Sequence, residues 1–352
     1  GQGKEREARS VSMFCLYLAV GISAIFCVGM GVFMEPILNL LGAGENTYVY
    51  ARQYALCVIV FGGIPTVLSN VLANLVRSVG RSREAGMGII LGGLLNIALD
   101  PLFMFVLMPQ GQEVLGAGIA TALSNGIACL FFIVVLIRMG KGSVLTFLPQ
   151  AGLPSRESIA AVFAVGVPSA VATFLFDLDY VIIDKLMVAY EDLALAAVGV
   201  VLKVERFPLN VGIGICQGML PLVAYNYGAG NHKRMTDISR LARKLGLVIA
   251  AASILLYEVF AGQFVRIFLS DPQALSMAAS FLRIRVLATP LMFLSFFTVY
   301  QFQAFGKGRI SLLLGVVRWL GFNIPMLFLL NSLFGMYGIV WSQVTADTLT
   351  VL

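Results

Sequence analysis

The feature that most constrains this chain is a succession of ten apolar segments, each long enough to cross a membrane as a helix. A spanning helix needs about 20 mostly apolar residues. The ten segments are residues 10–34, 48–76, 85–108, 114–138, 157–190, 193–226, 236–269, 273–304, 309–332 and 335–352. A water-soluble fold could not cover so much apolar surface, so the sequence predicts an all-α polytopic membrane protein.

The composition supports this class and excludes others. Of the 352 residues 59% are hydrophobic and only 12% are charged, whereas soluble domains carry about 25% charged residues. The net charge of +6 comes from Lys and Arg in short clusters between the apolar segments, which argues against a nucleic-acid-binding face. The five cysteines lie inside apolar segments without a CxxC pair, and His232 is the only histidine. A disulfide framework, a zinc site and multi-histidine metal chemistry are therefore excluded.

The connections between segments alternate in charge. The basic connections are "GQGKEREAR", "VRSVGRSREAG", "RMGKG", "GNHKRMTDISRLARK" and "FGKGR", and the connections between them lack Lys and Arg. Basic loops face the cytoplasm in most membrane proteins, which orients the bundle. Gly1 is neither an initiator Met nor the start of a signal peptide, and Leu352 lies inside an apolar segment. We therefore expect a fragment of a longer protein.

The order of landmarks indicates an internal duplication. Five pairs of similar sites are separated by 220 to 227 positions: Gly1 and Gly228, Pro65 and Pro290, Gly80 and Gly306, Pro101 and Pro325, and Gly118 and Gly338. Matching loops carry the same charge, so the repeats should be parallel, with an axis along the membrane normal. We expect two six-helix lobes: residues 1–150 without the first two helices, and residues 151–352 with an incomplete last helix. The stretch "LPQAGLPSRES" joins the two lobes.

Several stretches resemble one transporter family over essentially the whole chain. They are "GICQGMLPLVAYNYGAGNHKR", "GVPSAVATFL", "LNIALDPLF" and "GAGENTYVYARQY". These resemble the multidrug and toxic compound extrusion (MATE) family, in particular the bacterial and archaeal branch related to the DNA-damage-inducible F protein. The resemblance implies two lobes around a central cavity and export of organic, often cationic, compounds driven by inward H⁺ or Na⁺.

One carboxylate lies inside an apolar segment of the first half. A buried ionisable group costs at least about 2.5–3.5 kcal/mol in a bilayer, so the position of Asp100 inside an apolar segment requires an explanation. Asn96 lies four residues earlier, on the same helix face. Together they offer the hard oxygen ligands that accept a proton or Na⁺. The alternative is a structural one, in which Asp100 and Pro101 end the helix and Asn96 bonds to another helix.

The resemblance adds a third residue to this pair. Archaeal-type members of the family use an Asn and an Asp at this spacing for a cation site, completed by a Thr on the next helix and an Asp on the first helix. Asn96 and Asp100 match directly, and Thr121 matches with Ser124 as a competitor. The first-helix Asp would precede Gly1, so it has no counterpart in this sequence. We expect no cofactor beyond the coupling ion, H⁺ or Na⁺.

A second group of charges lies in the second half. Asp177, Tyr180 and Asp184 are spaced along nearly one face of segment 157–190, and the next segment carries Lys203, Glu205 and Arg206. Opposite charges on these consecutive helices should pair. Two interpretations stay open: a structural ion-pair network, or a coupling or substrate site in which Asp177 takes a proton. Family members of another branch bind Na⁺ with acids on the seventh and tenth helices, but segment 273–304 has no Asp or Glu.

Another buried charge, Arg318, should pair with an acid of its own lobe or extend to the cytoplasmic surface. We favour a structural role.

These observations favour a secondary antiporter in the plasma (inner) membrane. Its partners are the lipid bilayer and small organic substrates, with neither nucleic acid nor an obligate protein partner. An alternative is a lipid-linked oligosaccharide flippase of the same superfamily, although that would need a strongly cationic cavity for a pyrophosphate. An intramembrane enzyme is disfavoured because the sequence has no GxGD motif and lacks the histidines of serine or metal catalysis. We therefore predict that the protein is not an enzyme.

Overall fold

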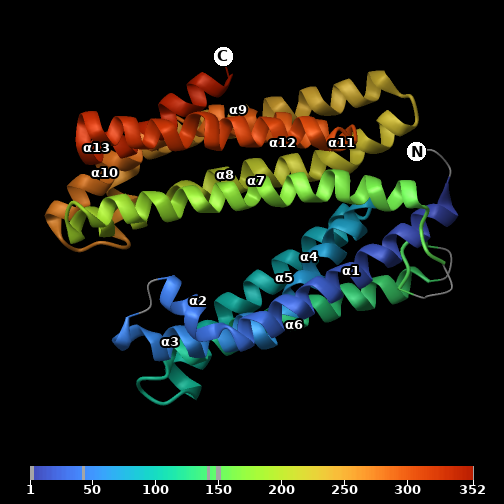
Figure 1. The fold of residues 1–352 in the computed structure, drawn as a ribbon, viewed down its shortest axis with the longest axis horizontal. Helices are drawn as coiled ribbons and strands as arrows, with labels where there is room; N and C mark the ends of the chain where they lie inside the picture. The colour runs from blue at the N-terminus through green and yellow to red at the C-terminus, as the bar shows by residue number, and fades with distance from the viewer. Residues whose placement is uncertain (1–3, 42–43, 141–142, 148–151, 352) are drawn as a thin grey trace. The chain divides into compact units, whose positions relative to one another are not determined.

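The computed structural model describes residues 4–41, 44–140, 143–147 and 152–351, and these fold into helices joined by short turns (Figure 1). The chain divides into two compact units, Gly3–Ile159 (the first unit) and Ala160–Leu352 (the second unit). Parts of the sequence singled out above lie outside the described residues: the landmark at residues 1–3, the first two residues of "GAGENTYVYARQY" at 42–43, part of the basic loop at 141–142, the first part of the linker at 148–151, and Leu352.

The first unit consists of the hairpin formed by its last two helices and of the helices that pack against that hairpin. Its elements are α1 (Glu5–Val32), α2 (Met34–Leu40), α3 (Glu45–Ala55), η1 (Leu56–Phe61), α4 (Gly63–Ser78), α5 (Ser82–Pro101), η2 (Leu102–Leu107) and α6 (Glu113–Met139). The segments η1 and η2 are π-helical turns that continue the preceding helices. The core centres on Leu72, Val76 and Phe132, which are almost fully buried between α4 and α6.

The second unit is larger and contains the largest core cluster. Its elements are α7 (Arg156–Val188), α8 (Asp192–Gly228), α9 (His232–Arg266), α10 (Pro272–Val286), α11 (Thr289–Ala304), α12 (Gly308–Val316), η4 (Val317–Asn323, π-helical) and α13 (Ile324–Val351). Ile183, Met187, Val198 and Phe281 are at most 1% exposed and join α7, α8 and α10.

The described helices include up to nine candidate membrane spans. Seven are long and apolar enough to span a bilayer, and two bent pairs bring the number to nine. The 44-residue stretch Gly308–Val351 counts as one of these. It reverses at Gly335, where φ is +62°, so that Arg318 and Asp347 on its two arms meet. The predicted all-helical membrane fold is confirmed.

Both bent spans have the same cause. Thr47–Phe61 and Gly63–Ser78 are bent by 50°, and Pro272–Val286 and Thr289–Ala304 by 46°. A proline lacks an N–H, and its ring clashes with the carbonyl four residues earlier. For Pro65 that carbonyl belongs to the last residue of η1, and for Pro290 to the last residue of α10.

The spacing of helix starts shows the internal repeat. The starts of α1 and α9 are 227 positions apart, as are those of α3 and α10. The starts of α4 and α11 are 226 positions apart, as are those of α5 and α12. The left-handed glycines Gly111 and Gly335 also correspond, since each lies in the turn of the last hairpin of its unit. The predicted duplication is therefore present in the fold.

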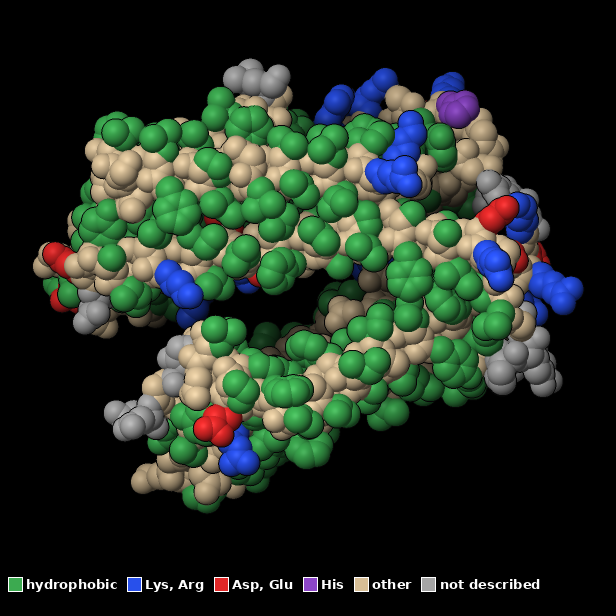
Figure 2. Space-filling view, viewed as in Figure 1, with side chains coloured by type: hydrophobic (Ala, Val, Ile, Leu, Met, Phe, Trp, Pro, Cys, Tyr) green, Lys and Arg blue, Asp and Glu red, His purple; other side chains and the backbone are tan. Residues whose placement is uncertain are grey.

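Apolar side chains form most of the outer surface of each unit. Ile25, Leu94, Val248 and Phe334 are among the many large hydrophobic residues that are more than half exposed. Figure 2 shows hydrophobic side chains spread along the visible surface of each unit, with backbone and other side chains between them. Such a surface is suited to contact with lipid chains rather than water.

Candidate functional site

The last hairpin of the first unit brings α5 and α6 unusually close together. Gly88 and Gly92 lie four residues apart on one face of α5 and meet Phe132 and Ala128 of α6. A Cβ on Gly92 would lie 3.1 Å from the Cβ of Ala128. Small residues at this spacing let membrane helices approach closely. Asn96 and Asp100 continue the same face of α5 at four-residue intervals, so their side chains also face α6.

That pair meets a hydroxyl on α6. Asn96 Nδ2 donates to Asp100 Oδ1 at 3.0 Å and lies 3.3 Å from Thr121 Oγ1. The Thr121 hydroxyl donates to the carbonyl of Ala117 at 2.9 Å, so it accepts from Asn96. Ser124 is buried, and its hydroxyl donates to the main-chain oxygen of Thr121 instead. The structure thus brings together Asn96, Asp100 and Thr121, and leaves Ser124 out of the cluster.

The cluster is half-buried and offers carboxylate, amide and hydroxyl oxygens. It has no basic partner among the described residues. No ion pair to Asp100 occurs in the described part of the first unit, where Arg81 and Glu84 form the ion pair at 3.3 Å. Pro101 follows directly, and the chain continues as the π-helical turn η2. Such turns often occur at functional sites. A carboxylate with an amide and a hydroxyl beside it can accept a proton or a small hard cation.

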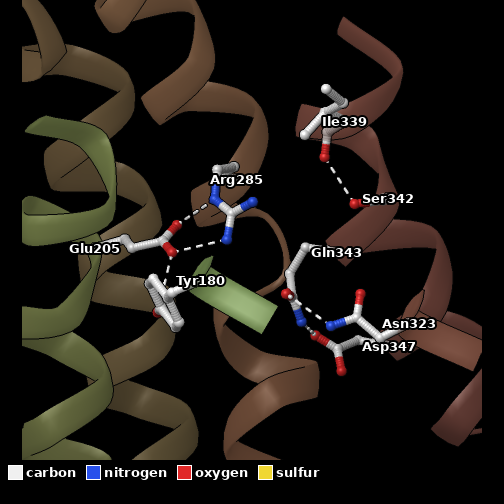
Figure 3. A network of polar contacts seen from close by, with 8 residues as sticks. All are labelled: Tyr180, Glu205, Arg285, Asn323, Ile339, Ser342, Gln343 and Asp347. Atoms are coloured by element: carbon white, nitrogen blue, oxygen red, sulfur yellow. Dashed lines mark hydrogen bonds and ion pairs between the residues drawn. The ribbon is translucent and has the colours of Figure 1, made fainter. Parts of the chain in front are cut away.

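The second unit contains a buried ion pair that joins three helices (Figure 3). Arg285 of α10 donates from Nε to Glu205 Oε2 at 2.6 Å and from Nη2 to Oε1 at 2.8 Å. Tyr180 of α7 donates its hydroxyl to Glu205 Oε1 at 3.3 Å. The side chains of Arg285 and Glu205 are 1% and 8% exposed. A bidentate pair of this kind fixes the mutual orientation of α7, α8 and α10.

A second buried network lies inside the hairpin of η4 and α13 (Figure 3). Arg318 Nε donates to Asp347 Oδ1 at 2.9 Å, and Gln343 Nε2 donates to Oδ2 at 2.6 Å. Asn323 Nδ2 approaches Gln343 Oε1 at 3.5 Å. Arg318 therefore pairs with an acid of its own unit, which was one of the two expectations for it. Its guanidinium also lies 4.6 Å from the ring centroid of Trp319.

A third buried carboxylate, Asp179, lies near both ion pairs. It is 1% exposed, and within the described residues neither of its oxygens makes a hydrogen bond. The charged groups of Arg285, Glu205 and Arg318 and the side-chain amide of Asn323 lie near it. With Asp347, the region then holds three carboxylates and two guanidinium groups. Asp179 is therefore the carboxylate without a guanidinium partner among the described residues of this region.

The residues predicted in this unit are divided between its interior and its surface. Tyr180 and Glu205 are buried, whereas Asp177, Asp184 and Lys203 are exposed. Tyr180 nevertheless stays next to Asp177, because Arg206 of α8 contacts both side chains.

The predicted pairing of α7 with α8 is found only at the surface. Arg206 Nη2 lies 3.5 Å from Asp177 Oδ1, and the Arg206 guanidinium lies 4.2 Å from the Tyr180 ring centroid. Glu205 pairs with Arg285 of α10, a helix outside the predicted pairing of α7 with α8. Arg285 and Asp347 were missed, although each lies inside an apolar segment; Asp347 stands alone there as Asp100 does, whereas Arg283 lies two residues before Arg285.

The chain also matches known proteins. The MatE family model matches residues 1–102 and 168–329. The chain belongs to the MatE family. It is 30% identical over 339 residues to the multidrug export protein MepA of Staphylococcus haemolyticus (strain JCSC1435), covering 96% of this chain and 73% of that protein. It is 27% identical over 347 residues to MepA of Staphylococcus aureus (strain MSSA476), covering 98% and 75%.

Solved MATE structures share the fold. A MATE transporter in complex with MaL6 superposes with a TM-score of 0.88 at 22% identity, covering 98% of this chain and 80% of that one. An outward-facing multidrug resistance MATE transporter of the MOP superfamily gives the same TM-score and identity, covering 98% and 79%. The protein is thus a multi-pass membrane transporter of the MATE family and not an enzyme, as the sequence predicted.

Proposed function

We propose that this MATE protein exports organic, often cationic, drugs in exchange for an inward-moving H⁺ or Na⁺ that binds at Asp100. The observation that carries the proposal is the cluster of Asn96, Asp100 and Thr121, where a half-buried carboxylate has oxygen ligands beside it and no described basic partner. The relatives named multidrug export proteins support drugs as the substrates. They favour efflux over the alternative of a lipid-linked oligosaccharide flippase.

Coupling follows from the charge of the hairpin. Without a cation, Asp100 places a negative charge between α5 and α6, which is costly in a membrane interior. A bound proton or Na⁺ removes that cost, and the conformation that binds the cation better is then favoured. Drug release can be linked to this shift by alternating access. The site resembles that of the branch related to the DNA-damage-inducible F protein, in which we place this chain. We also place it in the plasma (inner) membrane, with the basic loops in the cytoplasm.

The test is efflux of a cationic dye, ethidium, from proteoliposomes under separately imposed pH and Na⁺ gradients. One of the two gradients should drive efflux, and Asp100→Asn should abolish that response. Glu84→Gln is the matched control, since Glu84 lies on the same helix and is part of the solvent-exposed pair with Arg81. Unchanged gradient-driven efflux by Asp100→Asn would remove Asp100 from the mechanism.

The second unit offers two roles, and we propose both. The pairs of Glu205 with Arg285 and of Arg318 with Asp347 form a structural network, because each is bidentate or doubly bonded and fully enclosed. Asp179, the extra carboxylate beside them, is a second proton acceptor. This favours Asp179 over the exposed Asp177 as the protonated group of this unit.

Asp179→Asn, which mimics the protonated form, tests this second role. It should keep thermal stability and alter the response of efflux to the pH gradient. A wild-type response to the pH gradient would restrict coupling to the first unit.

A further inference from the structure

The first three turns of α9 carry a concentration of positive charge. Lys233, Arg234, Arg240, Arg243 and Lys244 lie within twelve residues, against the single acid Asp237, and all of these side chains are exposed. This gives a net charge of +4 with His232 neutral. In Figure 2, Lys and Arg side chains gather around the purple histidine, which is His232 because the chain has only one.

Three of the basic residues share a helix face with lipid-facing residues. Arg240 and Lys244 lie seven and eleven positions after Lys233, which places all three on one side of the helix. We call these three the basic face of α9. Val248 and Leu255, fifteen and twenty-two positions after Lys233, continue the same side and are 66% and 70% exposed. One stripe therefore runs from exposed cations to exposed apolar side chains.

The length of α9 places the change from basic to apolar near the membrane boundary. The helix has 35 residues, more than a bilayer core of about 30 Å requires at 1.5 Å per residue. From Lys244 to Arg266 the helix contains no other Lys or Arg and rises about 33 Å. Arg240 and Lys244 therefore lie at headgroup level, Lys233 lies about 16 Å further along the helix from Lys244 on the cytoplasmic side, and Val248 and Leu255 lie along the acyl chains.

The repeat supplies an internal comparison. The helix equivalent to α9 is α1, which begins 227 positions earlier. Its first turns carry Lys4, Glu5, Arg6, Glu7 and Arg9, a net charge of only +1. The tendency of cytoplasmic loops to be basic applies to both helices, so it does not account for the excess on α9.

We propose that Arg240 and Lys244, at the membrane end of the basic face of α9, bind the headgroup of an anionic phospholipid, whose acyl chains lie against Val248 and Leu255. Phosphate oxygens suit this surface because Arg can hold them through two parallel hydrogen bonds and Lys through a compact charge. Clusters of four to eight basic residues beside a membrane helix recognise anionic lipids in this way. The stripe commits the ligand to a lipid, because a free phosphate has nothing to place on its apolar half.

The experiment measures lipid binding directly and does not depend on transport. The purified protein in detergent is titrated with phosphatidylglycerol and, separately, with phosphatidylcholine, and bound lipid is counted by native mass spectrometry. The test variant is Arg240→Gln with Lys244→Gln. The matched control is Lys4→Gln with Arg6→Gln on α1, which also removes two positive charges from exposed side chains. Thermal unfolding of both variants confirms that they fold.

The wild-type protein should prefer phosphatidylglycerol, and the α9 variant should bind it about tenfold or more weakly, since each basic residue near an anionic headgroup contributes roughly fivefold. The α1 variant should stay close to wild type, and Asp237→Asn should bind more tightly. Equal losses in the α1 and α9 variants, or no loss in the α9 variant, would overturn the proposal. Equal competition by glycerol 3-phosphate would assign the surface to soluble phosphates and would also overturn it.

Discussion

Asn96 and Thr121 lie 25 positions apart on the two arms of one hairpin, and the amide of Asn96 reaches the Thr121 hydroxyl at 3.3 Å. The same amide nitrogen donates to Asp100 at 3.0 Å. Asn96 therefore links the carboxylate on its own helix to the hydroxyl on the next. The amide orients the carboxylate toward α6, so a cation bound at Asp100 affects the contact between the two helices.

The first prediction concerns the hydroxyl of this cluster. Thr121→Ala should weaken the binding of the coupling cation about tenfold, because it removes an oxygen ligand and leaves the Asn96 amide with one hydrogen-bond partner fewer. The measurement is the H⁺ or Na⁺ concentration that gives half-maximal ethidium efflux from proteoliposomes. Ser124→Ala is the matched control, since this hydroxyl bonds to the main chain of Thr121 instead. Thr121→Ser should restore most of the affinity, and equal effects of the two alanine variants would contradict the prediction.

The second prediction separates the function of Asp100 from folding. Asp100→Asn should leave the melting temperature of the purified protein equal to or above that of wild type, because it removes a half-buried charge that has no described basic partner. The measurement is thermal unfolding in detergent. The same variant should lose gradient-driven efflux. A large fall in melting temperature would instead assign Asp100 the structural role of ending α5.

The sequence was sufficient for the helices because their signal is local. Each span is a continuous apolar run, and the two bends lie where Pro65 and Pro290 remove a backbone donor. The Asn96 and Asp100 pair was equally accessible, because four-residue spacing on a helix determines which side chains share a face. The contact to Thr121 crosses between helices, and only the family resemblance suggested it.

The second-unit networks could not be predicted in the same way. Glu205 and Arg285 lie 80 positions apart on α8 and α10, so their pairing depends on which helices become neighbours. The rise per residue along a helix gives the depth of a side chain in the membrane, but it does not identify the partner of that side chain on another helix. The reversal at Gly335, which brings Arg318 to Asp347, depends on a single left-handed residue. Isolated charges in apolar spans signalled that partners must exist without identifying them.

The third prediction concerns the buried ion pair of the second unit. Glu205→Gln should destabilise the protein by about 3–5 kcal/mol, because it leaves the guanidinium of Arg285 buried without its counter-charge. Glu205→Leu combined with Arg285→Met should recover much of this loss, since an apolar pair of similar volume has no unpaired charge. Denaturation of Glu205→Leu, Arg285→Met and the double variant completes the cycle that gives the coupling free energy.

The exposed pair of Asp177 and Arg206 provides the control for this measurement. Its side chains are 62% and 43% exposed, and such pairs contribute about 0–1 kcal/mol. Asp177→Asn should therefore change stability little. A loss as large as that of Glu205→Gln would show that accessibility does not decide the strength of ion pairs in this unit.

The fourth prediction concerns the crossing of α7 and α12. A Cβ on Gly308 would collide with the main-chain carbonyl oxygen of Ala164, an atom that cannot move without shifting α7. Gly308→Ala should therefore destabilise the protein by about 1–3 kcal/mol, the usual cost of overpacking. Gly214→Ala in α8 is the matched control, because nothing lies within 4 Å of its added Cβ and alanine favours a helix over glycine by up to about 1 kcal/mol. Thermal unfolding of the two variants should move in opposite directions, and a loss in neither would mean that the two helices are not in close contact at Gly308.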